Sequence, residues 1–164
     1  MNNQVQAELK KIFNGRFSTS ESTRANYARG EDTYDPVLSK AVVFPETNEE
    51  VSKILSLCNE HKIPVVPFGT GTSLEGNVVG NDKGITISLE KMNKILSVNA
   101  EDFDCRVQAC VTKEQLNEYL REDGVFFPID PGANAAIGGM ASTSASGTMA
   151  VKYGTMKTVI TGLT

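Results

Sequence analysis

The sequence lacks several features that mark particular classes of protein. Its 164 residues hold no apolar run near the roughly 18 residues of a membrane-spanning helix, and residues 1–17 lack the apolar stretch of a secretory signal. The net charge of −4 does not suit a nucleic-acid-binding protein, which usually has a basic face. We therefore expect a globular protein with no transmembrane segment and no nucleic-acid partner.

Histidine and cysteine are scarce. The single histidine, His61, has no cysteine or histidine at metal-ligand spacing, so we expect no metal site in these residues. The three cysteines, Cys58, Cys105 and Cys110, are odd in number and far apart, which favours small core residues in a reducing compartment. A cytoplasmic location is the prediction, with peripheral attachment to the inner membrane as a variant. A mitochondrial transit peptide is less favoured, because Glu8 lies among the basic residues of the N-terminus.

Apolar spacing and turn residues predict a small parallel unit in the first part of the chain. Residues 1–40 are polar and predict one helix followed by an extended lead-in. Thr47 and Glu50 have the spacing of a capping box at the start of a second helix. A helix that crosses between two strands makes them parallel. The predicted elements are a helix over about 4–13, a strand over 41–44, a helix over 47–61, and strands from 65 and over 84–89.

The remainder of the chain predicts a second, mixed arrangement. Residues 103–111 alternate enough to form a strand, and Thr112 with Gln115 again has capping-box spacing, at the start of a helix that ends at Gly124. Residues 159–164 resemble the beginning of a strand, and truncation is the preferred explanation of that ending. The expected sheet is therefore incomplete, with mixed or antiparallel strands and helices.

The segment 67–76, Pro-Phe-Gly-Thr-Gly-Thr-Ser-Leu-Glu-Gly, has the composition of a phosphate-binding loop. Its three glycines permit backbone conformations closed to other residues and expose N–H groups on one side. The hydroxyl groups of Thr70, Thr72 and Ser73 add further donors. The loop contains no lysine or arginine, so uncharged donors would have to hold a pyrophosphate.

Two other phosphate-binding motifs fit this loop less well. A Walker loop requires a lysine directly after its last glycine, whereas the next lysine here is Lys83. The dinucleotide motif G-x-G-x-x-G requires glycine where Leu74 stands, although Glu90 lies where a ribose-binding acid would be expected. A nicotinamide-binding fold is therefore the weaker alternative, and a purely structural turn is another.

A second glycine-rich segment lies well downstream, between residues 130 and 154. Small side chains there let the backbone approach a large flat ligand closely. A tightly packed apolar helix would explain Gly138-Gly139 but not the further small residues at 130–132, 146–147 and 153–154. Two distant glycine-rich segments fit one long ligand with two ends.

These segments together resemble the p-cresol methylhydroxylase-type (vanillyl-alcohol oxidase-type) FAD-binding domain. The lead-in 27–32 and the segment 146–156 are most similar to cytochrome-linked D-lactate dehydrogenases, which are related to the glycolate oxidase flavoprotein subunit. The resemblance implies an α+β fold with an α/β N-terminal part. Its first subdomain would cover about 41–95 and its second, truncated subdomain about 96–164, after the lead-in of 1–40.

The resemblance also implies the cofactor and its contacts. FAD would be bound without a covalent link, because Thr72 stands where some relatives carry the histidine that tethers the flavin. None of the residues takes a catalytic role, and Asp130 is interpreted as a turn former or a flavin contact. The expected FAD-binding residues are Pro67, Phe68, Gly69, Thr70, Gly71, Thr72, Ser73, Gly76, Asp130, Pro131, Gly132, Ile137, Gly138, Gly139, Ala141, Thr143, Gly147, Tyr153 and Gly154.

The implied activity is oxidation of a D-2-hydroxyacid, of the D-lactate or glycolate type, to the 2-oxoacid. Hydride would pass to flavin N5, and the electrons would move on to a cytochrome or quinone. Substrate residues, and in D-lactate dehydrogenases a divalent metal, belong to a C-terminal part not contained in these residues. We therefore expect the 164 residues alone to be inactive. A non-catalytic flavin- or nucleotide-binding module is the alternative.

Overall fold

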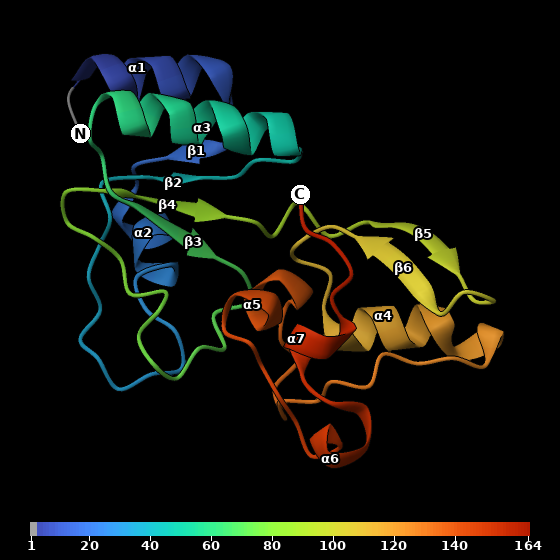
Figure 1. Ribbon diagram of the computed structural model, residues 1–164. Helices are drawn as coiled ribbons and strands as arrows, with labels where there is room; N and C mark the ends of the chain where they lie inside the picture. Colours follow the sequence, from blue (N-terminus) through green and yellow to red (C-terminus); the bar gives the residue numbers. More distant parts are fainter. Residues whose placement is uncertain (1–2) are drawn as a thin grey trace. The chain divides into compact units, whose positions relative to one another are not determined.

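The computed structural model describes residues 3–164, which form two compact units that divide between residues 91 and 92 (Figure 1). Each unit has its own hydrophobic core. No helix in the described part of the chain is both long and apolar enough to span a membrane. The two units are described in turn.

The first unit contains the predicted parallel arrangement. Its four strands form one sheet in the order β1-β2-β4-β3, in which β4 runs parallel to β2 and β3, and β1 runs antiparallel to β2. Helix α3 connects β2 to β3 and confirms the predicted β-α-β unit. The elements are α1 (Asn3–Ile12), β1 (Phe17–Ser18), α2 (Glu21–Asn26), β2 (Val42–Val43), α3 (Asn48–Glu60), β3 (Val65–Phe68) and β4 (Ile85–Ser88).

Helices α1 and α3 lie side by side over one face of this sheet (Figure 1). Their apolar side chains recur at helical spacing, and those of β4 alternate, so both sets face a common core. The core contains Leu9 of α1, Ile54 and Cys58 of α3, and Ile85 and Ile87 of β4. The core position predicted for Cys58 is confirmed.

Polar side chains occupy the other face of β4. Thr86 and Ser88 are fully buried there, and the Thr86 hydroxyl donates to the hydroxyl of Ser39 over 2.8 Å. The same Ser39 hydroxyl accepts the Asn81 N–H. Ser39 belongs to the lead-in, so this segment is packed against the sheet. The lead-in is also not wholly extended as predicted, because Ser20 caps the short helix α2.

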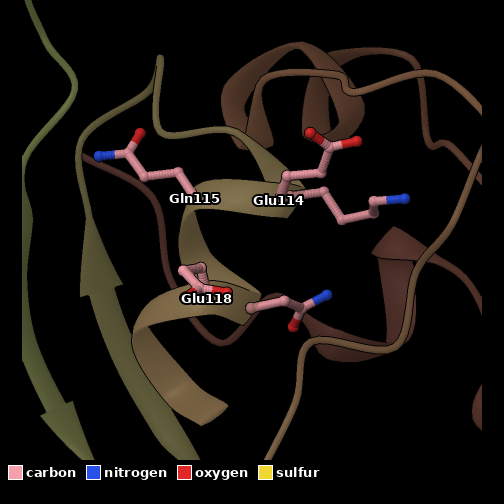
Figure 2. A pocket seen from close by; sticks show the side chains of 5 residues that line it. Glu114, Gln115 and Glu118 are labelled. Carbon is pink, nitrogen blue, oxygen red and sulfur yellow. The ribbon is translucent and has the colours of Figure 1, made fainter.

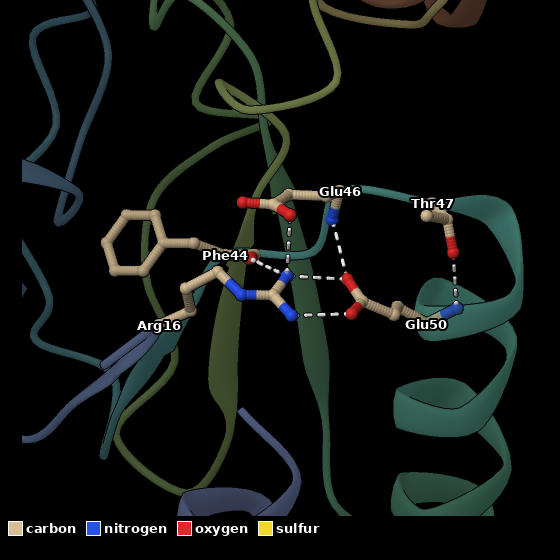
Figure 3. A network of polar contacts seen from close by, with 5 residues as sticks. All are labelled: Arg16, Phe44, Glu46, Thr47 and Glu50. Atoms are coloured by element: carbon tan, nitrogen blue, oxygen red, sulfur yellow. Dashed lines mark hydrogen bonds and ion pairs between the residues drawn. The ribbon is translucent and has the colours of Figure 1, made fainter. Parts of the chain in front are cut away.

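Arg16 ties the segment after α1 to the start of α3 (Figure 3). Its guanidinium donates two hydrogen bonds of 2.6 Å to the Glu50 carboxylate and one to the Phe44 carbonyl oxygen. The predicted N-cap is confirmed, since the Thr47 hydroxyl accepts the Glu50 N–H. On the other side of the box, the Glu50 carboxylate accepts the Glu46 N–H over 2.7 Å. Donation from Arg16 lowers the pKa of Glu50 to about 2, and the Thr47 N–H makes a weaker contribution to lowering it.

The second unit combines an antiparallel hairpin with short helices. Strand β6 is shorter than predicted, and its partner β5 was not predicted. The strand expected from residue 159 is wrong: Val159 ends α7, and residues 160–164 form neither helix nor strand. The elements are β5 (Ile95–Asn99), β6 (Asp104–Val107), α4 (Lys113–Leu120), the 3-10 helix η1 (Arg121–Asp123), α5 (Ile137–Ser142), α6 (Ala150–Tyr153) and α7 (Met156–Val159).

Two side chains in this unit behave differently from their predicted roles. The Thr112 hydroxyl caps α4 by accepting the Gln115 N–H, as predicted, but the Gln115 side chain donates to the Asn93 carbonyl oxygen instead of closing a capping box. Cys105 is exposed, because it lies on the open hairpin, so its predicted core position is wrong; Cys110 is buried as predicted.

Candidate functional site

The glycine-rich loop leaves β3 directly after Phe68. Gly71 and Gly76 adopt φ angles of +76° and +73°, which L side chains rarely adopt, so these glycines provide the special conformations expected from the sequence. Among the described residues, none accepts a hydrogen bond from the backbone N–H groups of residues 69–78. The loop therefore presents a run of uncommitted donors, which is the chemistry that a pyrophosphate requires.

A buried hydroxyl lies at the base of the loop. Ser88, the last residue of β4, pairs in register with Phe68 and is fully buried. Its Oγ atom has no hydrogen-bond partner in the described part of the chain. Buried polar groups are rarely left unpaired, so a ligand atom or a water molecule is required to satisfy this one.

The lead-in packs against the loop from within the same unit. The Glu31 N–H donates to the Gly71 carbonyl oxygen over 3.0 Å, and the Tyr34 ring contacts Gly76 closely enough to leave no room for a side chain there. Glu90, which follows β4, is also engaged by the lead-in: its carboxylate accepts a 2.5 Å hydrogen bond from the Tyr27 hydroxyl. Sequence reasoning missed these supports, because nothing in the local pattern links residues 27–34 to residue 71.

Within the second unit, the turn at Asp130 is held by an ion pair. Lys113 Nζ lies 2.9 Å from Asp130 Oδ1, which also accepts the Gly132 N–H over 3.0 Å. Donation from Lys113 and then from Gly132 lowers the pKa of Asp130. The carboxylate therefore stabilises the turn, in agreement with the prediction that Asp130 is a turn former.

The first residues of α4 hold the segment that follows this turn. The Glu114 N–H donates to the side chain of Asn134, and the Lys113 N–H donates to the Ala135 carbonyl oxygen. Thr112 and Ala136 form an isolated antiparallel bridge. Residues 130–136 are thus fixed by a helix start that sequence reasoning did not connect with them.

The downstream glycines divide into two groups. A Cβ atom at Gly138 would lie 2.8 Å from the Ala109 Cβ, and one at Gly147 would overlap the backbone of Asp130, so both positions are needed for packing within the unit. A Cβ atom at Gly132 or Gly139 would meet nothing within 4 Å. Only the second pair leaves open space in which a ligand could approach the backbone.

Most of the other predicted FAD contacts in this unit interact with neighbouring residues of the same unit. Ile137 and Ala141 pack against the core that includes Met140, and the Thr143 hydroxyl donates to the Gly139 carbonyl oxygen. The Tyr153 ring makes an edge contact with Phe126, and Gly154 has a φ angle of +81°. The structure thus brings Pro67–Gly76 together in the first unit and the remaining predicted residues together in the second.

A separate hollow lies over the start of α4 (Figure 2). It is lined by polar side chains of that helix, including the carboxylates of Glu114 and Glu118. None of the predicted FAD contacts lines it. The Lys113 ammonium that also lines the hollow is paired with Asp130, so the two carboxylates dominate its charge and disfavour a phosphate there.

The uncommitted donors of the glycine loop, on the surrounding parallel unit, form a candidate site for the pyrophosphate of a nucleotide cofactor. The chain belongs to the FAD binding domain family, which matches residues 39–164. It is 46% identical over 140 residues to the probable mitochondrial D-lactate dehydrogenase of Danio rerio, covering 85% of this chain and 28% of that protein. It is 40% identical to the mitochondrial cytochrome D-lactate dehydrogenase of Arabidopsis thaliana, covering 92% of this chain and 27% of that protein. The chain spans less than a third of these curated relatives.

Solved structures confirm the predicted fold. An alkyldihydroxyacetonephosphate synthase superposes with a TM-score of 0.86 at 22% identity, covering 96% of this chain and 32% of that one. A p-cresol methylhydroxylase superposes with a TM-score of 0.64 at 23% identity, covering 74% of this chain and 25% of that one. The fold is therefore that of the p-cresol methylhydroxylase-type FAD-binding domain.

Proposed function

We propose that this chain is the FAD-binding part of an oxidoreductase that converts a D-2-hydroxyacid, of the D-lactate or glycolate type, to the 2-oxoacid. The observation that carries the proposal is the loop after β3, in which the N–H groups of residues 69–78 are uncommitted. The similarity to two D-lactate dehydrogenases supports the substrate class. When bound, FAD would supply the acceptor for the hydride that leaves the substrate α-carbon.

The residues of this chain would bind and orient the cofactor. In the first unit, the N–H groups of the loop and the hydroxyl groups of Thr70, Thr72 and Ser73 would hold the pyrophosphate without a cation. In the second unit, the open backbone at Gly132 and Gly139 is available to the remainder of the cofactor. The other predicted contacts in both units remain part of the proposal.

The link to the cofactor is proposed to be non-covalent, because Thr72 offers a hydroxyl and no imidazole in the first loop. The electron acceptor is proposed to be a cytochrome or a quinone. The cytoplasmic location stays an untested prediction, and the names of two mitochondrial relatives support the mitochondrial alternative instead. No described residue is assigned as the catalytic base: the Asp130 carboxylate is engaged by Lys113. Catalytic residues, and any divalent metal, are therefore proposed to lie outside residues 1–164.

The test is to purify the protein as its gene encodes it and record its visible spectrum before and after denaturation. We expect a flavin spectrum, and we expect the flavin to separate from the denatured protein. Reduction of an artificial dye is then measured with a panel of D- and L-2-hydroxyacids. Flavin binding without reduction by any of these acids would favour a non-catalytic flavin-binding module, and a protein with no affinity for flavin would refute the whole proposal.

A further inference from the structure

The lead-in segment 27–34 lies ahead of the part of the chain that matches the FAD binding domain family. From its contacts we infer that this segment supports the pyrophosphate loop. Gly30 is the positioning residue that sets where the loop backbone lies. The inference rests on the proposed binding of FAD by the loop. It adds residues that neither the family match nor the glycine motif includes.

Gly30 is where the lead-in backbone approaches the loop most closely. A Cβ atom there would lie 2.7 Å from the Ser73 carbonyl oxygen and 2.8 Å from the Gly71 carbonyl oxygen. Both neighbours are backbone atoms, so no side-chain rotation can relieve the contact. The φ angle of Gly30 lies outside the left-handed region. A side chain at position 30 would therefore act only by pushing the loop away, and not by straining its own backbone.

One buried carboxylate fixes two of the contacts between the lead-in and the loop. Asp32, only 8% exposed, accepts the N–H groups of Gly30 and Tyr34 over 3.1 and 3.0 Å. Tyr34 in turn places its ring against Gly76. Asp32 thus holds Gly30 against the middle of the loop and Tyr34 against its end.

The other end of the segment supports the start of the loop. The Tyr27 ring makes an edge contact with Phe68, with 5.1 Å between ring centroids, and its hydroxyl donates to Glu90 at the end of β4. The Phe68 ring then contacts Gly71, where a Cβ atom would lie 2.8 Å from it. The lead-in therefore contacts the loop at its start, middle and end, and its own position decides where the N–H donors point.

The experiment compares Gly30→Ala with a matched control, Thr33→Ala, which changes an exposed residue of the same segment whose side chain has no hydrogen-bond partner in the described part of the chain. We expect G30A to weaken FAD binding by about tenfold, equivalent to about 1.4 kcal/mol, and T33A to leave it unchanged. The 31P resonances of the bound FAD pyrophosphate should shift in G30A but not in T33A. In the cofactor-free protein, the 1H–15N signals of Gly71 and Ser73 should shift in G30A alone.

A second, milder variant tests the inference in case G30A does not fold. Asp32→Asn keeps the size of the side chain but loses one acceptor, so it should weaken FAD binding in the same direction and by less. One outcome would overturn this inference and leave the proposed function standing. In that outcome the wild-type protein binds FAD, and G30A and D32N bind it equally tightly with unshifted 31P signals. Wild-type protein with no affinity for FAD would overturn the proposed function and the inference with it.

Discussion

Replacing Glu50 with glutamine should destabilise the first unit by about 2 kcal/mol at neutral pH. The Glu50 carboxylate receives two hydrogen bonds from Arg16, and its pKa falls from 4.5 to about 2. One pKa unit corresponds to about 1.36 kcal/mol, so the fall of about 2.5 in the pKa sets an upper limit of about 3 to 4 kcal/mol. The side chains of Arg16 and Glu50 are 23% and 22% exposed. Screening by water therefore lowers the stabilisation from this upper limit towards the roughly 1 kcal/mol typical of exposed pairs.

The pH dependence follows from the direction of the shift. The folded-state pKa of Glu50 is lowered, so its contribution is fully present above pH 4.5 and is lost as the pH falls towards 2. Urea unfolding followed by circular dichroism at pH 7 and pH 3 measures the difference between wild type and E50Q. That difference should shrink to less than about half at pH 3.

The control for this prediction is Glu60→Gln, at the exposed end of the same helix. It should leave the free energy of unfolding almost unchanged at both pH values. A wild-type minus E50Q difference that is equal at pH 7 and pH 3, or below about 0.5 kcal/mol at pH 7, would show that the ion pair does not stabilise the fold as argued.

Three further changes test the second unit. Gly138→Ala should lower the free energy of unfolding by about 1–3 kcal/mol, because its Cβ would meet Ala109. Gly139→Ala should raise it by about 0.5–1 kcal/mol, since Gly139 lies inside a helix and faces open space; the same change should weaken FAD binding, and unchanged affinity would remove Gly139 from the proposed site. Lys113→Met should raise the pKa of Asp130, as measured by a pH titration of its carboxylate. It should also weaken FAD binding, as measured by titrating the protein with the cofactor. An Asp130 pKa that is the same in K113M and wild type would contradict the ion pair.

The most predictable parts of the fold were those with a strong local signal. Apolar spacing and the cap at Thr47 predicted α3, and the glycine loop between β3 and β4 was predicted from its composition. Helix α2 and strand β5 were missed, because their own residues are polar or weakly patterned, although their partners are local: Ser20 caps α2, and β5 pairs with β6 in a short hairpin. The strand predicted from residue 159 failed for a different reason: Met156 is buried against Ile129 and Met140, which are distant in sequence, and its segment forms a short helix.

The residue sequence by itself determined which kind of ligand the loop is predicted to bind. Glycines, hydroxyl groups and the absence of lysine in the loop are local properties, and they predict an uncharged binding site for a pyrophosphate. Tertiary structure alone decided which glycines pack and which stay open, because Gly138 and Gly139 are identical in sequence terms and differ only in their neighbours. It also decided that Gly30 supports Gly71, a contact between backbones brought together by the fold and recorded in no motif.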